Sequence, residues 1–332
     1  MELSIQDAYL DFLKTEFLLE KLCENEHDSR ISYEIANSLE RFLLTNAQCE
    51  ANTGTCTKCG NSYLIYDLLR PCDKSDVKFD QELRRKSSLN YAKFLQISSL
   101  QRRNPSFGLK IKQMPNLELH LPKFNNIYLL KFGDFTKEIT VDRWNRLKSR
   151  YLLWCAENEL LFREEDFVNR LLLCALKYAS LLPRGQHWAI PLSEYRNINV
   201  DIEGFASPFN SQIVMLGNTG NFCSLFPEDI PLGSVGNFFK LTSFQVKDLK
   251  IAITPPYIES ILSEAARMAL KIKKLGGHFV FYGPYWNNAE FFYLLNKPEI
   301  KYEILKSKSY SYEDPNNNKV IHANFDSVKF SY

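Results

Sequence analysis

The spacing of apolar residues changes along the chain, and the change predicts two parts. Up to about residue 185, apolar side chains mostly recur every three to four residues, which is typical of amphipathic helices. Helices are predicted at the N-terminus, at residues 33–44, 76–100 and 164–181, and after the capping residue Thr140. Alternating residues at 117–124 and 126–135 predict a hairpin that turns at Asn125-Asn126. We place the domain boundary at Pro183-Arg184-Gly185.

The helix capped by Thr140 is expected to have an inward face and a basic outward face. The inward face holds Trp144, Leu147, Tyr151 and Leu152, and the outward face holds Arg143, Arg146, Lys148 and Arg150. Exposed arginines are candidate contacts for phosphate groups. A solvated surface is the commoner use of such a face, so both interpretations stay open.

Residues 186–332 predict an α/β sheet, because short apolar runs alternate there with helical stretches. The predicted strands are 200–206, 221–226, 249–253 and 278–282, with a terminal hairpin strand at 320–332. Helices are predicted at 211–216 and 259–270. The sequence contains no P-loop and no GxGxxG, so a phosphate-cradling nucleotide site is not indicated.

Composition places the chain among ordinary soluble globular proteins. Hydrophobic residues make up 45% and charged residues 24% of the 332 residues. A formal net charge of +2 means that any basic surface must be local. Neither a signal peptide nor a stretch of transmembrane length is recognisable, so we expect an intracellular, reducing compartment and no membrane contact.

Four cysteines form a candidate structural zinc site. Cys56 and Cys59 are separated by two residues and are followed by Gly60, as in a zinc knuckle, where a tight turn presents two thiolates to one ion. Cys49 and Cys72 flank this pair. A second paired motif is missing, so buried thiols without metal are the alternative.

The tetrapeptide Thr254-Pro255-Pro256-Tyr257 is the strongest candidate for chemistry. It follows the predicted strand 249–253 and precedes the helix 259–270. It therefore lies at the carboxyl end of a strand, where open α/β sheets bind ligands. Prolines lack an N–H and fix φ, which leaves rigid carbonyls beside an aromatic ring. That arrangement suits a base with an exocyclic amine; the alternative is a simple proline turn.

A series of blocks, in order and at similar spacing, resembles the phosphorylated-CTD-interacting factor family. The blocks are 204–210 (Gly-Phe-Ala-Ser-Pro-Phe-Asn), 222–229, 232–234, 254–257 and 279–286. Known members of this family include cap-specific adenosine N6-methyltransferases, which use S-adenosylmethionine to methylate the adenosine next to the mRNA cap. The resemblance covers residues 139–330 or so.

The resemblance implies a class I, Rossmann-like S-adenosylmethionine-dependent methyltransferase core at residues 186–332. A mainly helical domain at residues 1–185 would precede this core. Capped mRNA would be the partner, alone or within a capping or methyltransferase complex. Nothing in the sequence matches the two spaced tryptophans of the WW domain that animal members carry, so docking to the polymerase is not implied.

The resemblance also implies a site. The cofactor pocket would be lined by Phe205, Ala206, Ser207, Pro208 and Asn210, with Glu228 or Asp229 near the ribose and Gly233 and Ser234 near the adenine end. Thr254, Pro255, Pro256 and Tyr257 would hold the target adenine. Trp286, Arg184, Arg143 and Arg146 are candidate RNA contacts, although packing is the commoner role of an aromatic residue such as Trp286.

Thr254 replaces the asparagine of the family motif. A threonine hydroxyl is a shorter and less polarised acceptor than an amide oxygen. Three functions therefore stay open: an RNA adenosine N6-methyltransferase, a catalytically lapsed subunit that binds RNA or serves as a scaffold, and a DNA adenine methyltransferase. The last is included because Pro-Pro-aromatic motifs also serve enzymes that flip a base from a duplex.

Overall fold

The computed structural model describes residues 2–23, parts of 32–48, and residues 115–121, 126–182, 188–217, 221–314 and 319–332. The chain divides into two compact units. Unit 1 comprises residues 1–116 and 175–185, and unit 2 comprises residues 117–174 and 186–332. Within the described residues, no helix is long and apolar enough to cross a bilayer.

Unit 1 is helical where it is described. Its first helix, α1 (Glu2–Cys23), buries Ile5 and Tyr9. Helical residues between positions 35 and 45 bury Ile35 and Leu39, as the apolar spacing predicts. The Thr15 hydroxyl of α1 donates to the Ser180 carbonyl oxygen at 2.7 Å.

Unit 2 begins with a small antiparallel sheet of three strands in the order β1-β2-β3. The strands are β1 (Leu117–His120), β2 (Ile127–Phe132) and β3 (Phe135–Thr140). β1 and β2 pair as predicted, but the second predicted strand is wrong in its extent. It breaks at Gly133-Asp134, because Gly133 adopts φ of 58° and permits a two-residue turn into β3.

Two helices follow, α6 (Val141–Glu157) and α7 (Glu164–Leu181). The Thr140 hydroxyl caps α6 by accepting from the Arg143 N–H, as predicted. Two predictions about the faces of α6 were wrong. Leu152, predicted to face inward, is 41% exposed, and Arg143, predicted to face outward, is 1% exposed. Arg143 lies four residues before Leu147, so it belongs to the same inward stripe, whereas Leu152 lies off that stripe.

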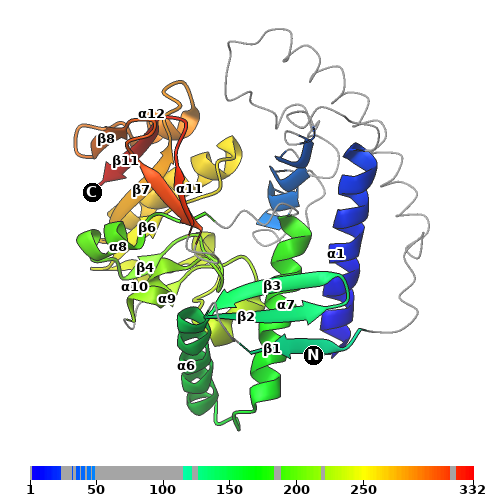
Figure 1. The fold of residues 1–332 in the computed structure, drawn as a ribbon. Coiled ribbons are helices and arrows are strands. Elements are labelled where there is room, and N and C mark those ends of the chain that lie inside the picture. Colours follow the sequence, from blue (N-terminus) through cyan, green and yellow to red (C-terminus); the bar gives the residue numbers. More distant parts are fainter. Residues whose placement is uncertain are drawn as a thin grey trace. The chain divides into compact units, whose positions relative to one another are not determined.

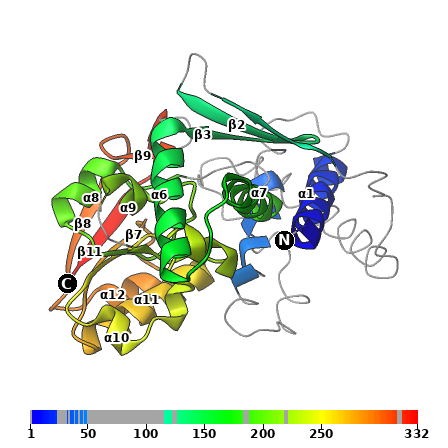
Figure 2. The same ribbon diagram turned by 90° about the horizontal axis from the view of Figure 1, so that it is seen from below.

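The main sheet has six strands in the order β5-β4-β6-β7-β11-β8. They are β4 (Ile202–Glu203), β5 (Asn221–Phe222), β6 (Lys250–Ile253), β7 (His278–Pro284), β8 (Lys301–Leu305) and β11 (Ser327–Ser331). The first four are mutually parallel, and β11 runs antiparallel to β7 and β8. The structure therefore confirms the predicted α/β class (Figure 1, Figure 2).

The single hairpin strand predicted at 320–332 is wrong in its extent, because this segment contains two strands, β10 (Lys319–His322) and β11. β10 pairs with β9 (Ser311–Asp314), whereas β11 enters the main sheet. Val328 and Phe330 of β11 are both 0% exposed, so burial of these side chains favours insertion between β7 and β8 over an exposed hairpin.

The remaining elements connect these strands. They are α8 (Leu192–Ile198), α9 (Gln212–Leu216), the 3₁₀ helices η1 (Pro227–Leu232) and η2 (Phe238–Lys240), α10 (Ser243–Val246), α11 (Glu259–Lys274) and α12 (Glu290–Leu295). The predicted helices at 211–216 and 259–270 correspond to α9 and α11.

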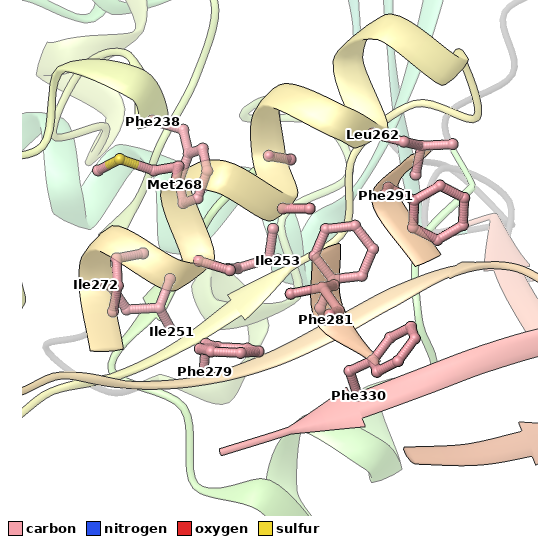
Figure 3. Close-up of a cluster of buried hydrophobic side chains, with 14 of the residues drawn as sticks. Phe238, Ile251, Ile253, Leu262, Met268, Ile272, Phe279, Phe281, Phe291 and Phe330 are labelled. Carbon is pink, nitrogen blue, oxygen red and sulfur yellow. The ribbon is translucent and has the colours of Figure 1, made fainter. Parts of the chain in front are cut away.

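The core of unit 2 lies between the main sheet and helices α11 and α12 (Figure 3). Side chains of β6, β7 and β11 face those of α11 and α12, and each strand presents apolar residues to this layer. The residues involved include Ile251, Ile253, Phe279, Phe281 and Phe330 from the sheet and Leu262, Met268, Ile272 and Phe291 from the helices. This layer fixes the directions in which β6 and β7 end.

Replacing Phe281 by alanine should lower the free energy of unfolding by about 3–5 kcal/mol, because a fully buried ring leaves a cavity that cannot close. Urea unfolding followed by tryptophan fluorescence measures the change. Phe244 is 94% exposed, so Phe244→Ala is the matched control and should change stability by less than about 0.5 kcal/mol. Equal losses in the two variants would contradict this assignment of the core.

Candidate functional site

The carboxyl ends of β4 and β6 lie side by side where the order of strands reverses. Of the strands in the main sheet, β4 comes first along the chain. β5 pairs on one side of it and β6 on the other. The register joins Glu203 to Ala252. A Cβ added to Gly204 would lie 3.0 Å from the Ala252 carbonyl oxygen, so glycine allows this close approach. Ligands of open α/β sheets bind at such a reversal, and residues 204–210 and 254–257 both start there.

The segment after β4 folds into a compact turn held by its own polar groups. The Asn210 amide oxygen accepts from the Ser207 N–H at 2.7 Å and from the Ser207 hydroxyl at 2.9 Å. Ser207 Oγ also accepts from the Phe209 N–H at 3.2 Å. Of the predicted cofactor contacts, Ser207 and Pro208 are buried, whereas Phe205, Ala206 and Asn210 are half-buried. The last three therefore offer surface to a ligand.

Arg143 holds this turn from α6. Its Nη1 donates to the carbonyl oxygens of Pro208 at 3.1 Å and Ser211 at 2.9 Å. Burial lowers the pKa of Arg143 to about 10, and the nearby Glu203 opposes the shift. The guanidinium is in the interior of unit 2, so it serves the turn rather than the phosphate of an RNA.

Glu203, the last residue of β4, is a buried carboxylate with several donors. One oxygen accepts from the Ser211 hydroxyl at 2.8 Å and from the N–H groups of Gln212 at 2.9 Å and Ile213 at 3.2 Å, at the start of α9. The other accepts from the Tyr195 hydroxyl of α8 at 2.8 Å. Burial raises the pKa of Glu203, and these hydrogen bonds counteract the rise.

After β6, the Thr254 hydroxyl has a protein partner, whereas no described residue donates to the carbonyl of Pro255, which is buried. The Thr254 hydroxyl donates to the Phe205 carbonyl oxygen at a long 3.4 Å. The Ile258 N–H donates to the Pro256 carbonyl oxygen at 2.7 Å. Among the residues that the structure describes, no donor occupies the Pro255 carbonyl. That carbonyl is the acceptor that the sequence predicted for an amine.

Tyr257 is fixed by side chains from distant parts of the chain. Its hydroxyl lies 2.6 Å from the Tyr312 hydroxyl, which lies 2.9 Å from Ser327 Oγ. The Tyr257 ring packs edge-on with Tyr312 and Phe325. Burial, together with the Tyr312 hydroxyl, raises the pKa of Tyr257, so the phenol stays neutral. Its ring is thus held in one orientation at the end of β6.

The predicted ribose and adenine residues lie beside β5. Residues 233–236 run along β5, and the Ser224 and Ser234 hydroxyls are 2.6 Å apart. Gly233 has φ of 102°, and a Cβ there would lie 2.4 Å from Arg150 Nη1. Asp229 is fully buried, and together with burial it raises the pKa of the Cys174 thiol of α7. Glu228 is half-buried, so it is the better placed of the two acids for a ribose.

The other residues predicted to contact RNA or zinc have different positions in the structure. Half-buried Trp286 packs edge-on against Phe291. The guanidinium of Arg146 donates to Asp142 at 3.2 Å. Arg184 and the predicted zinc ligands Cys49, Cys56, Cys59 and Cys72 lie outside the described residues. Within the described part of the chain, no group of three or more His, Cys, Asp or Glu side chains is arranged to hold a metal.

Sequence reasoning missed Tyr195, Glu203 and Tyr312. Glu203 carried a usable signal, because an acid inside an apolar strand must find donors when buried. Tyr195 and Tyr312 carried none, since α8 and β9 reach the strand ends only through the tertiary fold.

Lys137 gives a pH-dependent test of how the turn is supported. Its ammonium lies 4.9 Å from the centroid of the Phe209 ring, and burial lowers its pKa to about 8, with Asp314 opposing. From pH 8 up to its ordinary value of 10.5, the folded protein has released this proton while the unfolded chain keeps it. Stability therefore rises with pH through this range.

The Lys137→Met variant removes this contribution. Urea unfolding at a series of pH values should show the wild type gaining stability relative to the variant between about pH 8 and 10.5. Parallel curves for the two proteins would contradict the placement of a buried ammonium beside Phe209.

Both motif segments fall within a match to a known family. A sequence profile described as "Phosphorylated CTD interacting factor 1 WW domain" matches residues 147–314, just over half of the chain. The match includes every strand of the main sheet except β11. A search of the curated proteins found no match. The chain therefore belongs to the phosphorylated CTD interacting factor 1 family, which confirms the resemblance seen in the sequence.

Proposed function

We propose that this protein is an S-adenosylmethionine-dependent adenosine N6-methyltransferase that acts on RNA, with the cap-adjacent adenosine of mRNA as its expected target. The observation that carries the proposal is the juxtaposition of two segments at neighbouring strand ends. Residues 204–210 follow β4 and residues 254–257 follow β6, and the Thr254 hydroxyl donates to the Phe205 carbonyl oxygen between them. One segment would hold the methyl donor and the other the acceptor base.

The sheet supports this assignment. The strand order reverses at β4, because β5 lies on one side of it and β6 on the other. A strand from near the C-terminus, β11, lies between β7 and β8 and runs antiparallel to both. A nucleoside-containing ligand is expected outside the carboxyl ends at the reversal. Membership of the family, whose known members include cap-specific adenosine methyltransferases, supports the same reading.

The residues around the β4 turn fit S-adenosylmethionine by their chemistry. Phe205 and Ala206 offer apolar surface, the Asn210 side chain offers an amide, and half-buried Glu228 offers a carboxylate for ribose hydroxyls. The cofactor would supply an electrophilic methyl group on a sulfonium sulfur, which the adenine N6 attacks in line. The turn contributes a fixed position for that donor, because Arg143 holds the carbonyls of Pro208 and Ser211.

The second segment would prepare the amine. The lone pair of adenine N6 is delocalised into the ring, so the site must accept its hydrogens and draw the nitrogen toward tetrahedral geometry. The Pro255 carbonyl is one acceptor and the Thr254 oxygen is the other. The Tyr257 ring would stack on the base, which is worth about 1–3 kcal/mol. The positive charge that develops on N6 is released as a proton to solvent.

One observation favours a second candidate, a catalytically lapsed subunit that binds RNA. Thr254 stands where the family motif has asparagine, and its hydroxyl, whose proton is directed at the Phe205 carbonyl oxygen, is a shorter and less polarised acceptor than an amide oxygen. Loss of one hydrogen bond from the substrate amine in the transition state costs about 3–4 kcal/mol. Turnover separates the two candidates.

Purified protein incubated with tritiated S-adenosylmethionine should label capped RNA that begins with adenosine. Uncapped RNA and duplex DNA with the same sequence should be labelled more slowly, and RNA that begins with guanosine should not be labelled. If cofactor and RNA both bind but no transfer occurs, the lapsed subunit replaces the enzyme. Faster labelling of DNA would redirect the proposal to a DNA adenine methyltransferase.

Tyr257→Ala should lower kcat/KM by about 5- to 150-fold, the range that corresponds to a loss of 1–3 kcal/mol of stacking. Tyr257→Phe keeps the ring and loses only the hydroxyl contact with Tyr312, so it should retain most activity. Steady-state kinetics with the capped RNA measure both. A phenylalanine variant as impaired as the alanine variant would show that the hydroxyl, and not stacking, matters.

A further inference from the structure

Trp188 is an exposed indole on a segment that pairs with β9. The Ala189 N–H donates to the Glu313 carbonyl oxygen at 2.8 Å, and the Glu313 N–H donates to the Ala189 carbonyl oxygen at 2.9 Å. This antiparallel bridge places Trp188 and Tyr312 on one face, as diagonal neighbours within reach of aromatic side chains. Their rings stack, with centroids 6.3 Å apart and planes inclined at 27°.

The bridge is anchored on its other face. Successive side chains of an extended segment lie on opposite faces, so the Glu313 side chain lies on the face opposite to Trp188 and Tyr312. Its carboxylate accepts from the Leu192 N–H at 3.1 Å and from the Gln212 side-chain amide at 2.9 Å. These hydrogen bonds tie β9 to the first residues of α8 and α9. The backbone that carries Trp188 is therefore fixed relative to the main sheet.

Tyr312 connects Trp188 to the residue that is proposed to stack on the target base. The buried Tyr312 ring packs edge-on with Tyr257 at a centroid distance of 6.4 Å, and the two hydroxyl oxygens are 2.6 Å apart. Trp188, Tyr312 and Tyr257 thus form a continuous aromatic row. Its middle member is covered, whereas the Trp188 side is 39% exposed and Tyr257 is half-buried.

The placement of Trp188 matters more than its exposure, because single exposed apolar residues are common on protein surfaces. Proteins that recognise single-stranded RNA splay neighbouring bases apart and stack them on separate aromatic side chains. The aromatic row offers two such side chains, one at each end. An indole that is already held against Tyr312 loses little conformational freedom when a base stacks on it, which favours binding.

We propose that Trp188 stacks on a second nucleobase of the RNA, that of a nucleotide next to the target adenosine. Two nucleotides have this chemistry: the cap guanosine on one side of the adenosine, and the following nucleotide of the RNA on the other. Stacking uses the face of a base and tolerates any base identity, so the chemistry of the platform fits both. The inference rests on the proposed function, because that function places the target base at Tyr257.

RNA binding tests the inference without turnover. Fluorescence anisotropy is measured on protein saturated with S-adenosylhomocysteine, with a short capped RNA that begins with adenosine and carries a dye at its 3′ end. Trp188→Leu keeps an apolar side chain against Tyr312 and removes the aromatic plane. It should raise the Kd by about 5- to 150-fold, the range for loss of one base stack. Trp188→Phe keeps a plane and should recover most of the affinity.

Tyr302→Leu is the matched control. Tyr302 is an aromatic residue that is 48% exposed, and it lies on β8, which β7 and β11 separate from β6. This variant should bind the capped RNA as the wild type does. A loss of affinity as large as that of Trp188→Leu would overturn the inference, since the effect would then not depend on the aromatic row. Thermal unfolding of Trp188→Leu should stay close to that of the wild type.

Two altered RNAs identify the base that stacks. One carries a 5′ triphosphate in place of the cap, and the other has an abasic ribose directly after the adenosine. The RNA that lacks the stacked base should bind the wild type and Trp188→Leu equally, whereas the other should still distinguish them. An equal loss with the intact RNA and both altered RNAs would overturn the inference, because Trp188 would then act on the target base or through the fold.

The outcomes separate the inference from the proposed function. If the intact RNA binds the wild type and Trp188→Leu alike, the inference fails, whether or not methyl is transferred. If Trp188→Leu loses affinity in the expected pattern but the wild type transfers no methyl, the inference stands and the lapsed subunit replaces the enzyme. If the wild type binds none of the RNAs, both the inference and the RNA-directed function fail.

Discussion

The parallel pairing of β4 with β6 is the constraint on which the site depends. Because Glu203 pairs with Ala252, the chain leaves both strands at one edge of the sheet, and residues 204–210 and 254–257 must meet. The pairing is itself held by the apolar layer between the sheet and α11. Without that layer, neither the position of Thr254 nor that of the turn after β4 would be defined.

Several buried polar groups gather around this edge. Arg143 and Glu203 are both buried, and both hydrogen-bond to groups of the turn and of α9, although Arg143 Nε has no partner within the described residues. Removing one partner of such a set commonly costs 3–5 kcal/mol, about as much as a large cavity in a core, because the other partner is left buried without compensation. These residues therefore specify where the loops lie, at some expense in stability. A protein that needed only to fold would gain from apolar residues at the same positions.

The sequence predicted the class of fold and the segments of the site, and it failed where tertiary contacts decide. Apolar runs located β6, β7 and α11, and the motif at residues 254–257 was correctly placed after a strand. The same reasoning put Arg143 on an exposed face, because a charged residue was assumed to seek water; the carbonyls of Pro208 and Ser211 offered it partners inside. It also made β11 part of a hairpin, since nothing local reveals a strand that pairs with β7 and β8. Tyr195 and Tyr312 reach the site from elements with no motif of their own.

The central claim is that a methyl donor lies in the turn after β4, opposite a base held after β6. A crystal structure of the protein with S-adenosylhomocysteine tests this most directly. The account predicts density for the ligand against Phe205, Ala206 and Asn210, with its sulfur directed toward Thr254 and Pro255. A ligand bound elsewhere, or a site in which the protein's own side chains fill the space before Tyr257, would contradict the account.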